Sequence, residues 1–457
     1  MGSIEGKSER STQVFADLLY SEKDSRHRAI KSIGIAVLGT LFALRNKHTA
    51  LPIITVVASE AVAFVNQLEA QEKHDAAYSL LRQKARPEEP KSESPVSLEQ
   101  ISGEFALQTS EEFMTDMIPS IEHAKDRVWL EFMQFESGEI MSRLVDTLIA
   151  AKERGVDVSL HLDRYAKNFT RVGNRDVWRF SQILRNPTEE ISGLDERTLK
   201  QRNRFTTEYD IEKLQEAGIV DFPEVSGIQK YIPFVGGGNH RKFVKVDDTA
   251  WLGTTELTDS DITSMDNFMF RITSPKLVNI LTEIFLNPPQ EDVIILPQDS
   301  KPGQANLELL VDSGKPNSSI IYQRGLFMIA TAQNPIKYVT QYWPEGLLKQ
   351  ALFERARGGL SVTVVLEPDG DHRVWRHPFK LRRQKFIEEA KKAGVNIKYS
   401  ERSTHAKALV EVGKVALFGS NNLFEPSIIA GTKELSIYTE NPELVGLIDD
   451  RIFNHSK

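Results

Sequence analysis

The chain has 457 residues, of which 40% are hydrophobic, and this is enough for two or three globular domains with ordinary cores. It contains no cysteine, which excludes disulfides, thiolate catalysis and zinc sites built on sulfur. Its formal net charge of -7 argues against indiscriminate coating of nucleic acid, although local basic segments can still bind phosphate groups.

The first 85 residues predict an N-terminal helical extension, because apolar residues recur at helical spacing from Val14 to Leu81. No apolar signal core opens the chain, so we expect a cytoplasmic protein. The apolar runs over 33–44 and 51–65 are shorter than the ~20 residues of a spanning helix and favour a buried helical hairpin. A hairpin that rests in a membrane surface is the alternative, and it would make the protein peripheral to the membrane.

Residues 86–98 are polar and rich in proline, which predicts a linker. Beyond this linker, helical and strand-like segments alternate, and such alternation indicates an α/β fold. The first of these segments are a helix over 111–124, a strand over 128–132, a helix over 139–154 and a strand over 156–162.

Prolines interrupt this alternation after residue 287, and a second alternation begins at 318–322. We therefore expect one domain over 99–290, a second linker over 291–316 and a second domain over 317–457.

Two similar cassettes stand in the two predicted domains, Asn239-His240-Arg241-Lys242 in the first and Thr404-His405-Ala406-Lys407 in the second. Each leads through an apolar stretch into a short turn and a second apolar run, which ends at Gly253 or Gly419. Because side chains alternate along a strand, the His and Lys of each cassette should project from the same side. The chain is therefore predicted to be internally duplicated, with both cassettes in one shared active site.

The two cassettes and their contexts resemble the phospholipase D superfamily, and the resemblance covers about residues 100 to 457. The first cassette, followed by Asp247, is most similar to the bacterial cardiolipin-synthase branch. The resemblance implies two α-β-α sandwich domains related by a pseudo-twofold axis, with the active site between them. This chain departs from the family pattern at Val412, where an Asp is usual, and at Glu256, where an Asn is usual.

The resemblance also implies a reaction through a covalent phosphohistidine. It assigns His240 as nucleophile and His405 as general acid, with the order of the two left open, and places Lys242 and Lys407 on phosphate oxygens. An imidazole titrates near ~6.5, so one ring can be neutral while the other is protonated. This mechanism needs no metal and no other cofactor.

Each histidine needs a partner that fixes its tautomer, and a carboxylate usually fills this role. Asp266 and Glu434, which follow the first and the second cassette respectively, are the expected partners within each half. A surface salt bridge is the alternative reading for both carboxylates. Asp247 is expected to fix the turn between two strands rather than to touch substrate.

Further residues are expected around the phosphate group. Asn422 and Ser420 belong to the Gly-Ser-x-Asn element that follows the second cassette, whereas Glu256 would bring a negative charge to the equivalent place. Basic and aromatic residues also follow a predicted strand in each half, where they could clamp anionic headgroups or track a nucleic-acid backbone. The candidates among them are Trp178, Arg373 and Arg376.

The expected function is that of a phosphodiesterase or phosphatidyl transferase whose substrate is an anionic phosphodiester, a phospholipid in preference to a nucleic acid. Two alternatives stay open, a metal-independent nuclease of the same superfamily and a non-catalytic binding protein that retains the fold. The sequence leaves open whether the reaction is hydrolysis or transfer, and it does not determine the oligomeric state.

Overall fold

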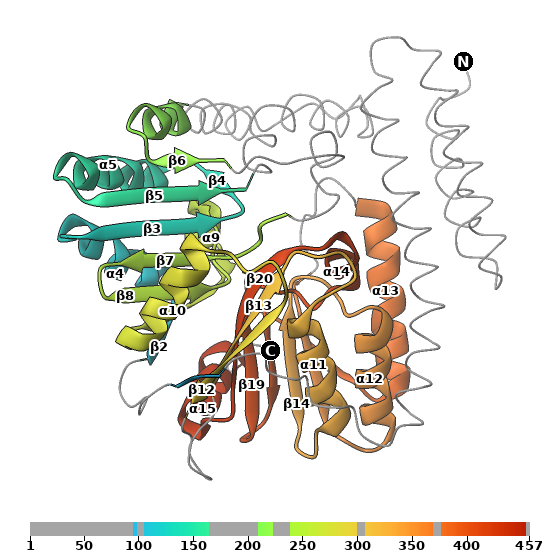
Figure 1. Cartoon of the computed structure of the whole chain (residues 1–457). Coiled ribbons are helices and arrows are strands. Elements are labelled where there is room, and N and C mark those ends of the chain that lie inside the picture. The colour runs from blue at the N-terminus through green and yellow to red at the C-terminus, as the bar shows by residue number, and fades with distance from the viewer. Residues whose placement is uncertain are drawn as a thin grey trace, which may run out of the picture. The chain divides into compact units, whose positions relative to one another are not determined.

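The computed structural model describes residues 95–97, 105–163, 209–222, 238–298, 307–368 and 376–453 (Figure 1). The chain divides into two compact units, one formed by residues 1–87 with 375–382 and the other by the rest. Both large β-sheets lie in the second unit. The predicted helical extension over 1–85 lies outside the described residues.

The first half is built on a seven-stranded sheet. Its strands are β2 (Phe105–Thr109), β3 (Arg127–Phe132), β5 (Asp157–Leu162), β6 (Val220–Asp221), β7 (Phe243–Val246), β8 (Thr249–Gly253) and β11 (Phe268–Ile272). They lie in the order β2-β11-β8-β7-β3-β5-β6. The pairs β3–β5 and β5–β6 are parallel, and the other pairs are antiparallel. The predicted alternation of helices and strands is thus a mixed α/β sheet.

The helices of this half whose full bounds lie within the described residues are α4 (Ser110–Glu122), α5 (Glu139–Glu153), α9 (Asp259–Thr263) and α10 (Pro275–Leu286). Helix α4 begins with a capping box, in which Thr109 and Glu112 each accept a hydrogen bond from the other's backbone N–H. Its residues Phe113, Met117 and Ile121 recur at helical spacing and are fully buried against the sheet. Helices α4 and α5 therefore share one core with one face of the strands.

The second half repeats this arrangement in a nine-stranded sheet (Figure 1). Its strands are β1 (Pro95–Ser97), β12 (Val293–Gln298), β13 (Leu307–Ser313), β14 (Ile336–Thr340), β15 (Val362–Leu366), β16 (Asn396–Tyr399), β18 (Ala408–Glu411), β19 (Val415–Gly419) and β20 (Lys433–Thr439). In the order β1-β12-β13-β20-β19-β18-β14-β15-β16, the last seven strands match those of the first sheet one for one. The internal duplication predicted from the cassettes therefore extends over the whole sheet.

The segment 291–316, which the sequence predicts as a linker, contains β12 and β13, and both are integral strands of the second sheet. Its prolines do not prevent pairing, because Pro297 lies in β12 opposite Val96 of the short edge strand β1. Residues 318–322 lie at the start of helix α11 (Ile320–Thr331), which Ser319 caps by accepting from the backbone N–H of Tyr322. The second sheet thus begins earlier in the chain than the sequence predicts.

The remaining helices of the second half are α12 (Gly346–Arg357), α13 (Arg376–Ala393), α14 (Glu425–Ala430) and α15 (Pro442–Phe453). Helices α11 and α12 pack on one side of this sheet, whereas α15 packs on β18 and β19 within a different core (Figure 1). In the part of the chain that the structure describes, no helix combines the length and the apolarity needed to cross a bilayer.

A single apolar core joins the two halves. It contains the faces of both sheets that look away from α4 and from α11, together with the buried sides of α10 and α15. The rings of Phe270 and Phe418, one from each sheet, lie 6.2 Å apart between centroids. Each large apolar side chain buried in such a core contributes roughly 1.5–3 kcal/mol. The two halves are therefore held together as firmly as the interior of one domain.

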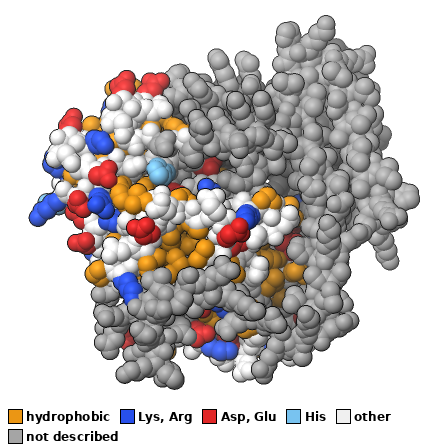
Figure 2. Space-filling model, viewed as in Figure 1, with side chains coloured by type: hydrophobic (Ala, Val, Ile, Leu, Met, Phe, Trp, Pro, Cys, Tyr) orange, Lys and Arg blue, Asp and Glu red, His pale blue; other side chains and the backbone are white. Residues whose placement is uncertain are grey.

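The surface in view in Figure 2 mixes hydrophobic, acidic and basic side chains over the described elements. The large hydrophobic residues exposed there and elsewhere among the described residues are Tyr209, Leu286 and Tyr399. Such scattered residues are normal for a folded protein surface.

The turn after the first cassette is fixed by Asp247. Its carboxylate accepts hydrogen bonds from the backbone N–H groups of residues 125, 126 and 127, at 2.9 to 3.0 Å. In the second half Val412 takes the same place in the chain, but the neighbouring Glu411 accepts from the backbone N–H groups of Gln333 and Asn334 instead. The longer side chain one position earlier thus replaces the missing Asp.

We expect Asp247→Ala to lower the free energy of unfolding by about 1–3 kcal/mol, because it leaves backbone donors without their acceptor. Denaturant midpoints of the two proteins would measure the loss. The matched control is Asp248→Ala, since Asp248 is the exposed neighbour in the same turn. Equal midpoints for the two variants would contradict the role assigned to Asp247.

Candidate active site

The two cassettes lie together because each forms backbone contacts with the opposite half. The backbone N–H of His240 donates to the carbonyl of Lys433 at 2.9 Å, and that of His405 donates to the carbonyl of Asp266 at 3.1 Å. Asn239 also forms a parallel bridge with Lys433. In the mirrored position, the short strands β10 (Met265–Asp266) and β17 (Ser403–Thr404) pair in parallel. The main chain itself therefore brings both histidines into one place.

The two lysines are held in the same way. Each Nζ donates to the carbonyl oxygen of the histidine in its own cassette, at 2.7 Å in both halves. Lys242 is 0% exposed and Lys407 is 2% exposed, so neither ammonium group is stabilised by bulk water. A buried ammonium group is stable only beside negative charge, so the two lysines favour the binding of an anion at this point.

His240 is oriented by Glu434 of the opposite half. Its Nδ1 lies 3.0 Å from both carboxylate oxygens, and Ser420 donates its hydroxyl proton to the same carboxylate. Burial raises the pKa of Glu434, but His240 and Lys242 outweigh this effect and leave the pKa below its ordinary value. An ionised Glu434 thus fixes the proton on Nδ1 and leaves Nε2 as the nitrogen for chemistry.

This pairing differs from the prediction, in which Glu434 orients His405 and Asp266 orients His240. The strand that carries Glu434 crosses to the other cassette, so the carboxylate serves the histidine of the first half. Asp266 contributes its backbone carbonyl, which accepts from the N–H groups of His405 and Ala406. The sequence identifies Glu434 as a histidine partner, but it does not reveal that the partner is the histidine of the other half.

His405 has a different partner. The backbone N–H of Thr254 donates to Phe268 as that of Ser420 donates to Leu435, so Asn267 is the counterpart of Glu434. An amide therefore stands where the second half has a carboxylate. The Nδ1 of His405 lies 2.8 Å from the carbonyl oxygen of Thr254 and 3.6 Å from a carboxylate oxygen of Asp261.

Asp261 is the residue that the sequence reasoning missed. Its carboxylate accepts from the hydroxyl of Thr258 at 2.8 Å and from the amide of Asn267 at 2.9 Å. The only signal in the sequence was the Thr258-x-x-Asp261 spacing, in which the hydroxyl of Thr258 accepts from the backbone N–H of Asp261. That spacing indicates the start of a helix, here α9, and does not point to a histidine.

The charges of the site favour a neutral His405. Burial, Lys407 and Lys242 hold the pKa of His405 well below its ordinary value. Burial and Lys242 likewise hold the pKa of Lys407 well below its usual range. An anion bound among these groups would stabilise their protonated forms.

The two residues at the Asn position of the Gly-Ser-x-Asn element differ in what they contact. Glu256 lies 2.7 Å from the Nζ of Lys242, and its other oxygen accepts from the backbone N–H of Gln134 at 3.1 Å. Asn422 is buried, and its Oδ1 has no hydrogen-bond partner among the described residues. Ser420, predicted to touch substrate, instead holds Glu434.

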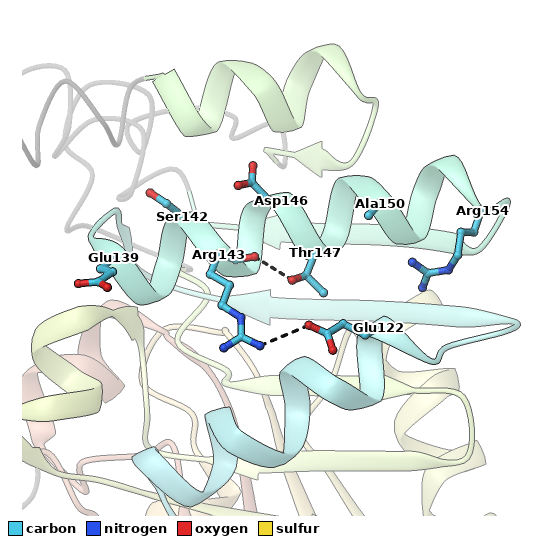
Figure 3. Close-up of a pocket in the computed structure, with 8 residues that line it drawn as sticks. All are labelled: Glu122, Glu139, Ser142, Arg143, Asp146, Thr147, Ala150 and Arg154. Carbon is cyan, nitrogen blue, oxygen red and sulfur yellow. Dashed lines mark hydrogen bonds and ion pairs between the residues drawn. The ribbon is translucent and has the colours of Figure 1, made fainter.

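The remaining predicted substrate residues are not placed. Trp178 and Arg373 lie outside the described residues. Arg376 is the first residue of α13, but the structure does not describe its side chain. A hollow of about 590 Å³ between α4 and α5 is lined by residues of both signs, among them Glu122, Arg143 and Asp146 (Figure 3). It contains none of the cassette residues and is not the site of the chemistry.

Two duplicated α/β halves that share paired His-x-Lys cassettes define a phospholipase D-like protein. The chain matches the family model described as "Cardiolipin synthase, PLD-like domain" over residues 117–287 and 326–455, and it belongs to this family. The predicted superfamily and the two-domain fold are therefore confirmed.

The chain is similar to cardiolipin synthase A of Serratia proteamaculans (strain 568), with 22% identity over 325 residues. It is similar at the same identity over 339 residues to cardiolipin synthase A of Yersinia pseudotuberculosis serotype O:1b (strain IP 31758). Each match covers 69% of this chain and 62% of the relative, so the chain spans less than two thirds of these relatives.

Among solved structures, the chain resembles phosphatidylserine synthase of Haemophilus influenzae Rd KW20. The TM-score is 0.57 at 16% identity, and the match covers 79% of this chain and 88% of that one. At this identity the likeness shows the fold.

Proposed function

We propose that the chain is a phosphatidyl transferase or phosphodiesterase that acts on phospholipids through a phosphohistidine. The observation that carries the proposal is the pairing of the Nδ1 of His240 with Glu434 across the two halves. It leaves Nε2 as the free nitrogen of His240, in a site that also contains the buried Lys242 and Lys407, as a nucleophile needs when the target is an anionic phosphodiester.

In the first step, Nε2 of His240 attacks phosphorus and the bond between phosphorus and the leaving oxygen breaks. The leaving alkoxide takes a proton from His405. Glu434 stabilises the positive charge that develops on the attacking ring, and Lys242 and Lys407 hold the phosphate oxygens. In the second step, His405 takes a proton from water or an alcohol, whose oxygen attacks phosphorus and breaks the bond to His240.

The lowered pKa of His405 leaves this ring neutral in the empty site at neutral pH. The anionic phosphodiester brings negative charge between Lys242 and Lys407, and this favours uptake of a proton by His405. His405 therefore gains the proton that a general acid needs when substrate binds.

Phospholipid is the preferred substrate because relatives that share 22% identity are cardiolipin synthases, and cardiolipin is itself a phospholipid. Such a substrate places the reaction at a membrane surface. A nucleic acid would also offer phosphodiesters, so the two substrate classes need to be compared directly.

The test is turnover of vesicles containing phosphatidylglycerol against turnover of single-stranded DNA, both in excess chelator. We expect headgroup release or transfer to an added alcohol, and no cleavage of DNA. DNA cleavage that weakens steeply with salt would instead make the chain a nuclease. Vesicle binding without turnover on either substrate would make it a binding protein.

A further inference from the structure

We propose that Glu256 is a built-in competing anion, which holds Lys242 in the empty site and must release it before substrate phosphate can bind there. This inference rests on the proposed function, because it concerns the phosphate site of that reaction. Glu256 would then lower the affinity of the site for phosphate, whereas a substrate contact would raise it.

The pseudo-twofold relation fixes the comparison. Glu256 follows Gly253 by the same number of positions as Asn422 follows Gly419, and the backbone N–H groups of Thr254 and Ser420 make equivalent bonds to the neighbouring strand. An amide in one half thus occupies the position that a carboxylate occupies in the other. Two side chains differ within this repeated framework, since Glu256 stands in the place of Asn422 and Asn267 in the place of Glu434.

The carboxylate is engaged with the catalytic lysine. Glu256 Oε1 lies 2.7 Å from Lys242 Nζ, and the two side chains are 3% and 0% exposed. A buried pair at this distance interacts strongly, since little water screens it. Glu256 therefore occupies a donor of Lys242 that the mechanism assigns to a phosphate oxygen.

The negative charge acts beyond this pair. Burial raises the pKa of Asp261, and the charge of Glu256 raises it further. Glu256 also opposes the fall in the pKa of Lys407 that burial and Lys242 cause. The charge of Glu256 thus acts on the groups around His405 as well as on Lys242.

An amide and a carboxylate affect a phosphate in opposite ways. The Nδ2 group of an Asn can donate to a phosphate oxygen, whereas an ionised carboxylate only accepts and repels the same oxygen. When a phosphate binds, Lys242 must turn from Glu256 to the new anion. Glu256 keeps its hydrogen bond from the backbone N–H of Gln134, so it has a place to remain.

The test is the affinity of the full chain for inorganic phosphate, measured by titration calorimetry for the wild type, Glu256→Gln and Glu256→Asn. We expect both variants to bind phosphate about tenfold or more tightly than the wild type. They should also unfold at lower temperature without phosphate, because Lys242 loses its buried counter-ion. Added phosphate should then raise their melting temperature more than it raises that of the wild type.

Two further variants serve as controls. Asn422→Glu places the same charge in the mirrored corner and is expected to weaken phosphate binding about tenfold or more. Glu308 lies on β13, outside the cassettes, and its buried carboxylate pairs with Arg324 of α11 at 2.6 Å. Glu308→Gln removes this carboxylate and should leave phosphate affinity unchanged. If Glu256→Gln fails to fold, Glu256→Asp shortens the side chain, and an intermediate gain in affinity is expected.

Unchanged or weaker phosphate binding in the folded Glu256 variants would overturn the inference while leaving the proposed reaction intact. The proposed reaction itself fails if Lys242→Ala and Lys407→Ala bind phosphate as the wild type does. The two failures are therefore distinguished by different variants.

Discussion

His240→Ala and His405→Ala are each expected to lower kcat for a phosphodiester with a poor leaving group by about 10⁴-fold or more. In the proposed mechanism, each change removes a group that forms or breaks a bond to the reacting atoms. The double variant should lose little more than either single one, because the two rings act as a unit. Initial rates on a phospholipid, with circular dichroism to verify the fold, are the measurement.

A chromogenic diester with a good leaving group separates the two roles, because its departure needs no acid. With this substrate, His405→Ala should still form a phosphoenzyme that survives an alkaline quench, and His240→Ala should not. The reverse result would exchange the assigned roles. Absence of a phosphoenzyme in both variants and in the wild type would contradict covalent catalysis.

The pH dependence gives an independent view of His405. Its pKa lies below the ordinary 6.5, and a general acid must be protonated. Since kcat/KM reports the free enzyme, kcat/KM for the poor leaving group should rise as pH falls through 6.5 toward the lowered pKa. The good leaving group should not show this rise. A rise of equal size for both substrates would assign the titration to another group.

Glu434→Gln is expected to lower kcat by roughly 10³- to 10⁴-fold, because a glutamine can present a donor to Nδ1 of His240 and favour the wrong tautomer. It also removes the charge that stabilises the phosphorylated ring. The measurement is kcat on the same phospholipid, together with the denaturant midpoint, since Glu434 is 1% exposed.

The matched variant is Asp261→Asn, which alters the carboxylate on the other histidine. We expect a loss of less than about tenfold, because the Nδ1 of His405 lies 2.8 Å from the carbonyl of Thr254 and 3.6 Å from Asp261. An equal loss in the two variants would show that both histidines depend on a carboxylate to the same degree.

Much of this fold could be predicted because its strands carry local signals. The apolar runs after each cassette and the helix–strand alternation over 111–162 correspond to observed elements within one or two residues. The duplication could also be read from the cassettes. Its extent could be predicted only in part. The repeat is visible in segments before the cassettes, 154–158 with 359–365 and 216–219 with 392–395, but β13 has no such signal and follows prolines that also occur in linkers.

The site was harder to predict, since its key contacts join residues far apart in the sequence. His240 and Glu434 are 194 positions apart, and no local pattern shows that each half serves the histidine of the other. The same limitation hid Asp261, whose nearest signal is a helix cap. Glu411 was missed because the family position, Val412, lies one residue further on.

The exchange of partners between the halves affects the stage of chain synthesis at which the site can be completed. A ribosome adds roughly 5–20 residues per second, so the first cassette emerges well before residue 434. A nascent chain that ends before β20 lacks the carboxylate of His240 and the carbonyl that accepts from its backbone N–H. We therefore expect a chain that ends before β20 to lack the paired form of His240, and with it the proposed phosphoryl transfer.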